Sequence, residues 1–232
     1  MITVRPAEDR GRFDFGWLDT AHTFSFGEYR DPRHMGFGSL RVINEDRVAP
    51  SRGFGTHPHR DMEILSFVLA GRLEHRDSLG GHGVIGPGEV QRITAGRGVM
   101  HSEFNPSASE QVHFLQVWIK PRALGLEPSY EQRSFAGVGD GLTLVASLDG
   151  RDGSIVINQD ALVLLGKLGE GGAASHPLGE GRRAWVQVMR GQVILNGTRL
   201  DAGDGAAVTD ETDLRFEAGA RGEFLLFDMG SA

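Results

Sequence analysis

Two short clusters in this chain carry the residue types that bind first-row metals, His57-Pro58-His59 and His101-Ser102-Glu103. Each lies in a run typical of a β-strand joined to its neighbours by glycine turns. Side chains two positions apart on a strand point to the same face, so each pair can direct both ligand atoms at one point. Imidazole with carboxylate suits iron, manganese, nickel, copper or zinc, and 2-His-1-carboxylate sets with open positions are typical of non-haem Fe(II) oxygen chemistry. The clusters therefore predict one metal site.

The composition argues against several other classes of protein. The 232 residues are 39% hydrophobic and 24% charged, which suits one large or two small globular domains. The net charge of −7, without any run of Lys and Arg, argues against a direct nucleic-acid partner. The chain contains no stretch of about 18 apolar residues, so no membrane span is predicted. Residues 1–10 lack the apolar core of a signal peptide. The chain has no cysteine and therefore no disulfide. We expect a cytoplasmic protein without a membrane partner.

Glycine content and spacing predict the elements that must hold the two clusters. The 34 glycines favour many short strands, because glycine supplies the positive φ of tight turns. Apolar runs at 62–71, 84–90 and 112–119 are separated by turns such as Gly80-Gly81-His82-Gly83. Strands at spacings of about 8 to 12 residues indicate a sandwich or barrel. The expected fold is all-β.

The second half of the chain repeats the first. Residues 184–191 match the pattern of 65–71, Asn196-Gly197 is a strong hairpin signal, and residues 202–205 resemble 87–90. This duplication predicts two β-barrels, with a metal-binding domain at 1–125 and a second domain at 126–232. Because two barrels can pack within one chain, we expect a monomer.

Only the first barrel is expected to hold a metal. When the glycine turns of the two halves are superposed, Phe216 falls at the place of His101 and Ala218 at that of Glu103. The pair His57 and His59 is matched by only one histidine in the second half, His176, which falls near the place of His57. The C-terminal half should then serve the core, an interface or the wall of the first site.

These motifs resemble those of bicupins, and more closely those of the pirin family in its bacterial quercetin 2,3-dioxygenase-like branch. The first cupin motif, H-x-H followed by Glu, is matched by His57, His59 and Glu63, and the second, G-x-x-H-x-x-x-N, by the run from Gly98 to Asn105. Narrower pirin-like marks are Gly16-Trp17-Leu18-Asp19, His22-Thr23-Phe24-Ser25-Phe26, Leu40-Arg41-Val42-Ile43-Asn44, His75-Arg76-Asp77-Ser78 and the run from Ala95 to Glu103. The resemblance implies two jelly-roll-like cupin barrels.

The resemblance also implies a ligand set, because in pirins the second-motif glutamate supplies the carboxylate. The implied metal ligands are His57, His59, His101 and Glu103. Glu63 is then expected on an outer barrel face or beside the ligands, with ligation as the alternative. The implied cofactor is one divalent metal ion. Fe(2+) is the expected ion, and Ni, Mn, Co, Cu or Zn are the alternatives.

The implied activity is that of a quercetin 2,3-dioxygenase, which opens a flavonol with O2 and releases CO. The substrates would be a flavonol-like small molecule and O2. Glu103 is expected to accept the proton of the flavonol 3-hydroxyl as general base. Phe54 and Arg60 flank the first ligand pair and would line the substrate pocket; a core phenylalanine and a surface arginine are the alternatives.

The remaining histidines of the first half have no metal-spaced partner beside them, and we expect them to be structural or exposed. They are His22, His34, His75, His82 and His113. Phe24 and Phe26 alternate onto one face, which is typical of core residues.

Two other functions compete with dioxygenation. Some pirin relatives are described as metal-dependent regulators, so a redox-responsive protein that binds a transcription factor or metabolic enzyme is the alternative from another class. A cupin isomerase that uses its metal only as a Lewis acid is the third. Oxygen dependence separates them, because only a dioxygenase stops without O2.

Overall fold

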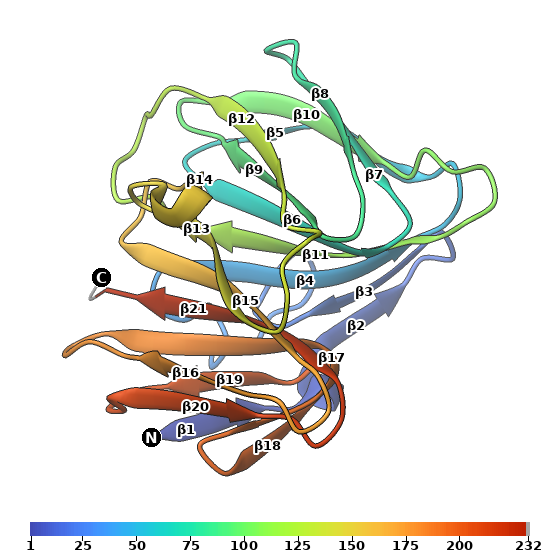
Figure 1. The fold of residues 1–232 in the computed structure, drawn as a ribbon. Helices are drawn as coiled ribbons and strands as arrows, with labels where there is room; N and C mark the ends of the chain where they lie inside the picture. Colours follow the sequence, from blue (N-terminus) through green and yellow to red (C-terminus); the bar gives the residue numbers. More distant parts are fainter. Residues whose placement is uncertain (231–232) are drawn as a thin grey trace. The chain divides into compact units, whose positions relative to one another are not determined.

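The computed structural model describes residues 1–230, which are almost entirely strands and turns (Figure 1). Contacts divide them into two compact units: an N-terminal unit of Gly11–Gly137 and Ile157–Gln159, and a C-terminal unit of Met1–Arg10, Val138–Val156 and the chain from Asp160. Residues 1–10, 126–137 and 157–159 thus group with the opposite half from the one expected, and the domains at 1–125 and 126–232 stay a proposal. The all-β expectation is confirmed.

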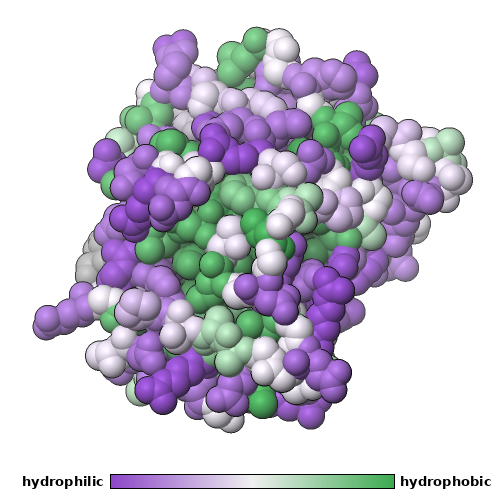
Figure 2. All heavy atoms as spheres, in the orientation of Figure 1, coloured by the Kyte–Doolittle hydropathy of each residue, from purple (hydrophilic) through white to green (hydrophobic). Residues whose placement is uncertain are grey.

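In the same orientation, most of the visible surface is hydrophilic, and hydrophobic residues form patches among the hydrophilic ones (Figure 2). Among residues 1–230, no helix has the length and apolar character needed to cross a membrane.

Two sheets form the N-terminal unit, and Figure 1 shows them as two layers. The larger has the strand order β12-β9-β6-β11-β4-β3-β2. Its strands are β2 (Gly11–Asp14), β3 (Leu18–His22), β4 (Leu40–Val48), β6 (Glu63–Ala70), β9 (Glu89–Thr94), β11 (Val112–Ile119) and β12 (Ser129–Ser134). The smaller has the order β5-β10-β7-β8. Its strands are β5 (Gly53–His59), β7 (Leu73–Asp77), β8 (His82–Ile85) and β10 (Val99–Phe104).

Alternation along β10 decides which of its side chains face the barrel interior. Val99, His101 and Glu103 are buried, whereas Met100 and Phe104 are exposed. Apolar side chains from both sheets close the interior around them, and removing that surface from water is the main force that holds the two layers together. One apolar cluster in this interior comprises Leu18, Val48, Val68, Leu73, Ile85, Val112 and Phe114.

The register of β10 against β5 brings the two sequence clusters together. His101 lies opposite His57, and a shift of register follows, so that Glu103 lies opposite Phe54. A bulge of this kind turns neighbouring side chains relative to one another, and such bulges are common beside active sites.

The C-terminal unit is built from a 10-stranded sheet around an apolar interior. Its elements are β1 (Ile2–Arg5), η1 (Ala7–Asp9), β13 (Gly141–Ser147), η2 (Arg151–Gly153), β14 (Ile155–Val156), β15 (Ala161–Leu168), β16 (Ala173–Pro177), β17 (Arg183–Leu195), β18 (Thr198–Asp201), β19 (Gly205–Val208), β20 (Asp213–Glu217) and β21 (Gly222–Met229). Phe216 is fully buried and stacks on Phe224 with ring centroids 4.5 Å apart.

Strand pairing corrects the register of the internal repeat. Ala174 lies opposite Phe216 in β16 and β20, just as His57 lies opposite His101 in β5 and β10. His176 therefore takes the place of the second histidine of the H-x-H motif, not the first. The sequence comparison missed this because the connection from β16 to β17 is longer than that from β5 to β6.

Candidate metal centre

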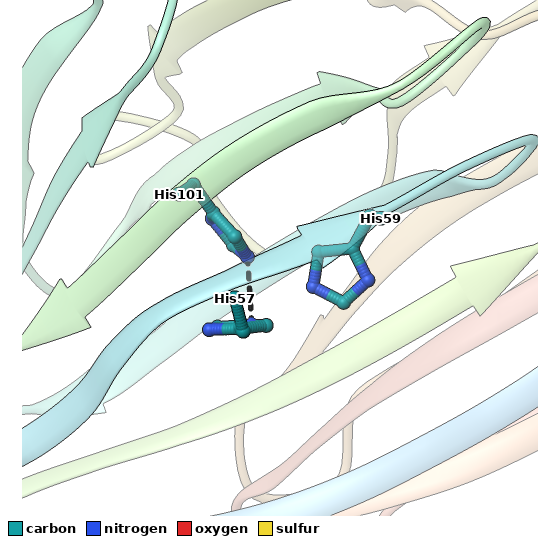
Figure 3. A group of neighbouring side chains, drawn as sticks. All are labelled: His57, His59 and His101. Carbon is teal, nitrogen blue, oxygen red and sulfur yellow. Dashed lines mark hydrogen bonds between the residues drawn. The ribbon is translucent and has the colours of Figure 1, made fainter.

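Three histidines converge from two neighbouring strands. His57 and His59 project from β5 and His101 from β10, and their rings point toward one another (Figure 3). One ring nitrogen from each lies within 4.8 Å of the others. The ring centroids are 4.5 Å apart for His57 and His101, and 4.7 Å apart for each of the other two pairs. The i, i+2 spacing and the cross-strand pair produce the cluster predicted from the sequence.

A backbone carbonyl fixes the proton on His57. Its Nδ1 lies 2.7 Å from the carbonyl oxygen of Gly55, which can only accept a hydrogen bond. Nδ1 must therefore carry the hydrogen, and in the neutral ring Nε2 keeps its lone pair. That Nε2 lies 3.0 Å from Nε2 of His101.

A second chain of contacts orients His101. Nε2 of His75 lies 2.8 Å from Oδ2 of Asp77, a carboxylate that backbone N–H groups of Leu79 and Gly81 also hold. With its proton on Nε2, His75 offers a lone pair on Nδ1, which lies 3.3 Å from Nδ1 of His101. His101 then donates from Nδ1 and keeps the lone pair on Nε2.

The three rings suit a cation. Burial lowers the pKa of His59 to about 4 and that of His101 to about 2, so both are neutral near pH 7. Nε2 of His59 is buried and has no hydrogen-bond partner among the described residues. Two facing lone pairs and an orphaned nitrogen are costly unless an ion is shared between them, and metal-binding histidines characteristically donate their other N–H to a carbonyl or a carboxylate-linked group. The donor set fits a divalent first-row metal.

Glu103 lies beside this cluster and is held by two amides. It is 2% exposed; Nε2 of Gln91 donates to its Oε1 over 2.8 Å and Nε2 of Gln116 to its Oε2 over 2.6 Å. A carboxylate has about four acceptor positions, so lone pairs remain for an ion. Burial raises the pKa of Glu103 to about 7, against the effect of the two amides.

The four expected ligands do not form a single group within residues 1–230. A ligand oxygen of Glu103 lies within 4.8 Å of His101 and His75, whereas His57 and His59 group with His101 alone. His101 is thus common to both groups. Ligation by all four residues remains a prediction.

Glu63 has hydrogen-bond partners of its own and belongs to neither of the two groups of candidate ligands found among residues 1–230. Nδ2 of Asn158 donates to its Oε1 and the hydroxyl of Thr94 to its Oε2, each over 2.9 Å. The side chain of Glu63 is fully buried, so the expectation that it lies on an outer barrel face is wrong. Its strand, β6, is a central strand of the larger sheet, between β9 and β11. Burial also raises its pKa.

A cavity of about 680 Å³ lies against the histidines. Aromatic side chains form much of its wall, namely Phe13, Phe15, Phe26, Phe54 and Trp118. The ring of Trp118 meets His59 edge to face at 4.7 Å and Phe26 at 5.3 Å. A cavity of this size and character accommodates a planar aromatic molecule.

Comparison with known proteins agrees with this geometry. A family model described as Pirin matches residues 3–119, and one described as the quercetinase C-terminal cupin domain matches residues 144–229. The chain belongs to the pirin family. It is 46% identical over 229 residues to a quercetin 2,3-dioxygenase of Escherichia coli K12, covering 99% of each chain, and 43% identical to a putative quercetin 2,3-dioxygenase of Pasteurella multocida, covering 99% of this chain and 100% of the other.

A solved structure of a family member contains a metal. The bacterial pirin YhhW from Escherichia coli, in complex with nickel(II), superposes with a TM-score of 0.96 at 46% identity over 100% of both chains. The two cupin domains and the quercetinase-like oxidoreductase class expected from the sequence are confirmed by these comparisons. None of these names indicates a regulatory protein.

The structure places the two expected pocket residues at the cavity. Phe54 and Arg60 both line it. Arg60 is exposed, and its Nε donates to the carbonyl oxygen of Arg97 over 3.2 Å. Phe24 is buried as expected, whereas Phe26 lines the cavity instead of the core.

His75 and His22 lie closer to the site than the sequence predicts. His75 was expected to lack a partner, but strand pairing sets Glu103 opposite it, and His101 lies within 3.3 Å. The signal was present in His75-Arg76-Asp77, which has the same i, i+2 spacing as the ligand pairs. His22 lines the cavity. His113 pairs with Glu45 over 2.9 Å, in keeping with the structural role expected for it.

Proposed function

We propose that this chain is a metal-dependent dioxygenase that opens flavonols such as quercetin with O2 and releases CO. The observation that carries the proposal is the convergence of the Nε2 lone pairs of His57 and His101, with the orphaned Nε2 of His59, at the wall of an aromatic cavity. Relatives named quercetin 2,3-dioxygenase support it.

The residues that would hold the metal are His57, His59, His101 and Glu103. We propose Fe(2+) as the resident ion; the nickel(II) complex of YhhW supports Ni(2+) as the alternative. Four protein ligands leave positions open on an ion that accepts six, and when bound it supplies Lewis acidity to the 3-hydroxy/4-keto edge of the substrate.

The chain's own residues then position the substrate and move its proton. Trp118 and Phe26, already perpendicular to one another, form a wall against which a flavonol ring can pack. Glu103 accepts the proton of the 3-hydroxyl, and its raised pKa suits a base that works near neutral pH. Gln116 and Gln91 hold its oxygens in place for this transfer.

The test is oxygen uptake and CO release by metal-loaded protein given quercetin, with His101→Ala as the inactive comparison. The proposal requires one O2 consumed and one CO released for each flavonol opened. Conversion of quercetin at the same rate without O2 would contradict it and favour an isomerase. Stoichiometric metal with no uptake would contradict it in favour of a non-enzymatic role.

A further inference from the structure

A polar strip on the larger sheet faces into the cavity beside the proposed metal site, and none of its residues is a proposed metal ligand. Asn44 and Asp46 stand two positions apart on β4, so their side chains project from the same face, and both line the cavity. Strand pairing sets Asn44 opposite Gln116 of β11 and Asp46 opposite Thr20 of β3. Thr20 and Gln116 also line the cavity.

The amide oxygen of Asn44 lacks a partner among the residues that the structure describes. The residue is 4% exposed, and its Oδ1 is buried without a hydrogen-bond partner among residues 1–230. Buried polar groups are ordinarily paired, because an unmade hydrogen bond costs stability that burial cannot recover. An unpaired amide oxygen on a residue that lines a cavity can accept a hydrogen bond from a molecule that enters the cavity.

Asp46 adds a second acceptor beside it. Its carboxyl is 5% exposed, on the same face as Asn44. No arginine or lysine pairs with it in the described ion pairs, whereas Glu45 on the opposite face of β4 accepts from both His113 and Arg47. The described contact of the Asp46 carboxyl is with the neutral hydroxyl of Thr20, so the carboxyl is an acceptor suited to neutral donors.

We propose that Asn44 and Asp46 form a subsite that binds hydroxyl groups on the rings of a polyphenolic substrate, away from the edge that faces the histidines. The inference rests on the proposed function and names the substrate class, an aromatic ring bearing hydroxyl donors. A phenolic O–H donates to Asn44 Oδ1 or to the Asp46 carboxyl, while the aromatic wall packs against the ring. The two acceptors make the cavity discriminate against rings that lack hydroxyl groups.

Two flavonols separate this subsite from the metal site. Quercetin and 3-hydroxyflavone share the 3-hydroxy/4-keto edge, but only quercetin carries further ring hydroxyls. We would titrate each into nickel-loaded protein without O2 and follow tryptophan fluorescence. The wild-type protein should bind quercetin at least about tenfold more tightly, which corresponds to one or two hydrogen bonds.

Asn44→Leu and Asp46→Leu should each weaken quercetin binding by about fivefold to tenfold and leave 3-hydroxyflavone unchanged. Asn44→Leu should also raise the melting temperature of the free protein, because it replaces an unpaired buried amide with an apolar group of similar size. Glu45→Gln is the matched control, since it changes the same strand on the face turned away from the cavity. If Asp46→Leu does not fold, Asn44→Leu decides alone.

Equal affinity of wild-type protein for both flavonols, or no binding of quercetin, would overturn the subsite. An unchanged affinity ratio in Asn44→Leu would also overturn it and would mean that water satisfies the amide. Oxygen uptake is measured separately on aerobic samples. Selective binding without uptake would therefore contradict the dioxygenase and leave the subsite intact.

Discussion

Nδ1 of His75 lies 3.3 Å from Nδ1 of His101, and the far nitrogen of His75 is held by Asp77. A buried carboxylate thus controls, through one imidazole, which nitrogen of the next imidazole carries a proton. His75 and Asp77 are 0% and 2% exposed in their side chains, and Tyr130 stacks on the His75 ring at 4.5 Å. Packing and hydrogen bonds together prevent this pair from turning.

The first prediction concerns this chain of contacts. Asp77→Asn should lower the affinity for Ni(2+) by about 10-fold to 100-fold, because an amide can donate to His75 and so allow the other proton arrangement at His101. The measurement is competition against a chromophoric chelator, which needs no turnover. His82→Asn is the control, an exposed histidine paired with Glu74. Equal affinities in Asp77→Asn and the wild-type protein would show that Asp77 does not orient the ligand.

His101→Ala should abolish stoichiometric metal binding, because His101 belongs to both groups of candidate ligands. The fold should persist, with the free energy of unfolding lowered by about 1 to 3 kcal/mol from lost packing. Elemental analysis of the purified variant tests the first part and thermal melting the second. His113→Ala, a histidine paired with Glu45 outside the cluster, should keep its metal. Full metal content in His101→Ala would remove His101 from the ligand set.

Glu103→Gln separates metal binding from proton transfer. The variant should retain part of its metal through the three histidines, while oxygen uptake per bound metal should fall by about 100-fold or more, because an amide cannot accept the substrate proton. The NH2 group of the new amide would also face the N–H that either Gln91 or Gln116 now donates, because the two glutamines donate to different oxygens of Glu103. Uptake equal to that of the wild-type protein, normalised to metal, would exclude Glu103 as the base.

The sequence predicts the architecture well because its signals are local. Glycine turns, alternating strands and the Asn196-Gly197 hairpin lie within a few residues of the elements they define, and two repeats reinforce each other. The histidine cluster was predicted for the same reason, since each i, i+2 pair fixes its own direction. The errors came where loop length mattered, as at His176, whose register depends on the connection to the following strand.

The polar side of the site could not be read from the sequence. Asn44 and Asp46 have the i, i+2 spacing of one strand face, but Gln116 joins them only when β4 pairs with β11, which lies far along the chain. Glu63 matched a ligand motif, but its buried contacts with Thr94 and Asn158 are set by the tertiary fold. Pairings over such sequence distances leave no periodic signal within one strand.

The last prediction follows from the burial of Asp46. Desolvation raises its pKa from 3.8 to about 7, so between about pH 4 and pH 7 the folded state holds a proton that the unfolded state has released. The free energy of unfolding contributed by this group is therefore highest at low pH and is lost as pH rises toward 7. Asp46→Asn removes the titration. Relative to this variant, the wild-type protein should lose roughly 2 kcal/mol between pH 5 and pH 7.5, measured by urea unfolding at each pH. Glu63 titrates in both proteins, so its effect cancels in the difference, whereas the charge of Asp46 also raises the pKa of Glu103, so the difference reports these two coupled carboxyl groups together. Parallel pH profiles for the two proteins would show that Asp46 is ionised in the folded state across this range.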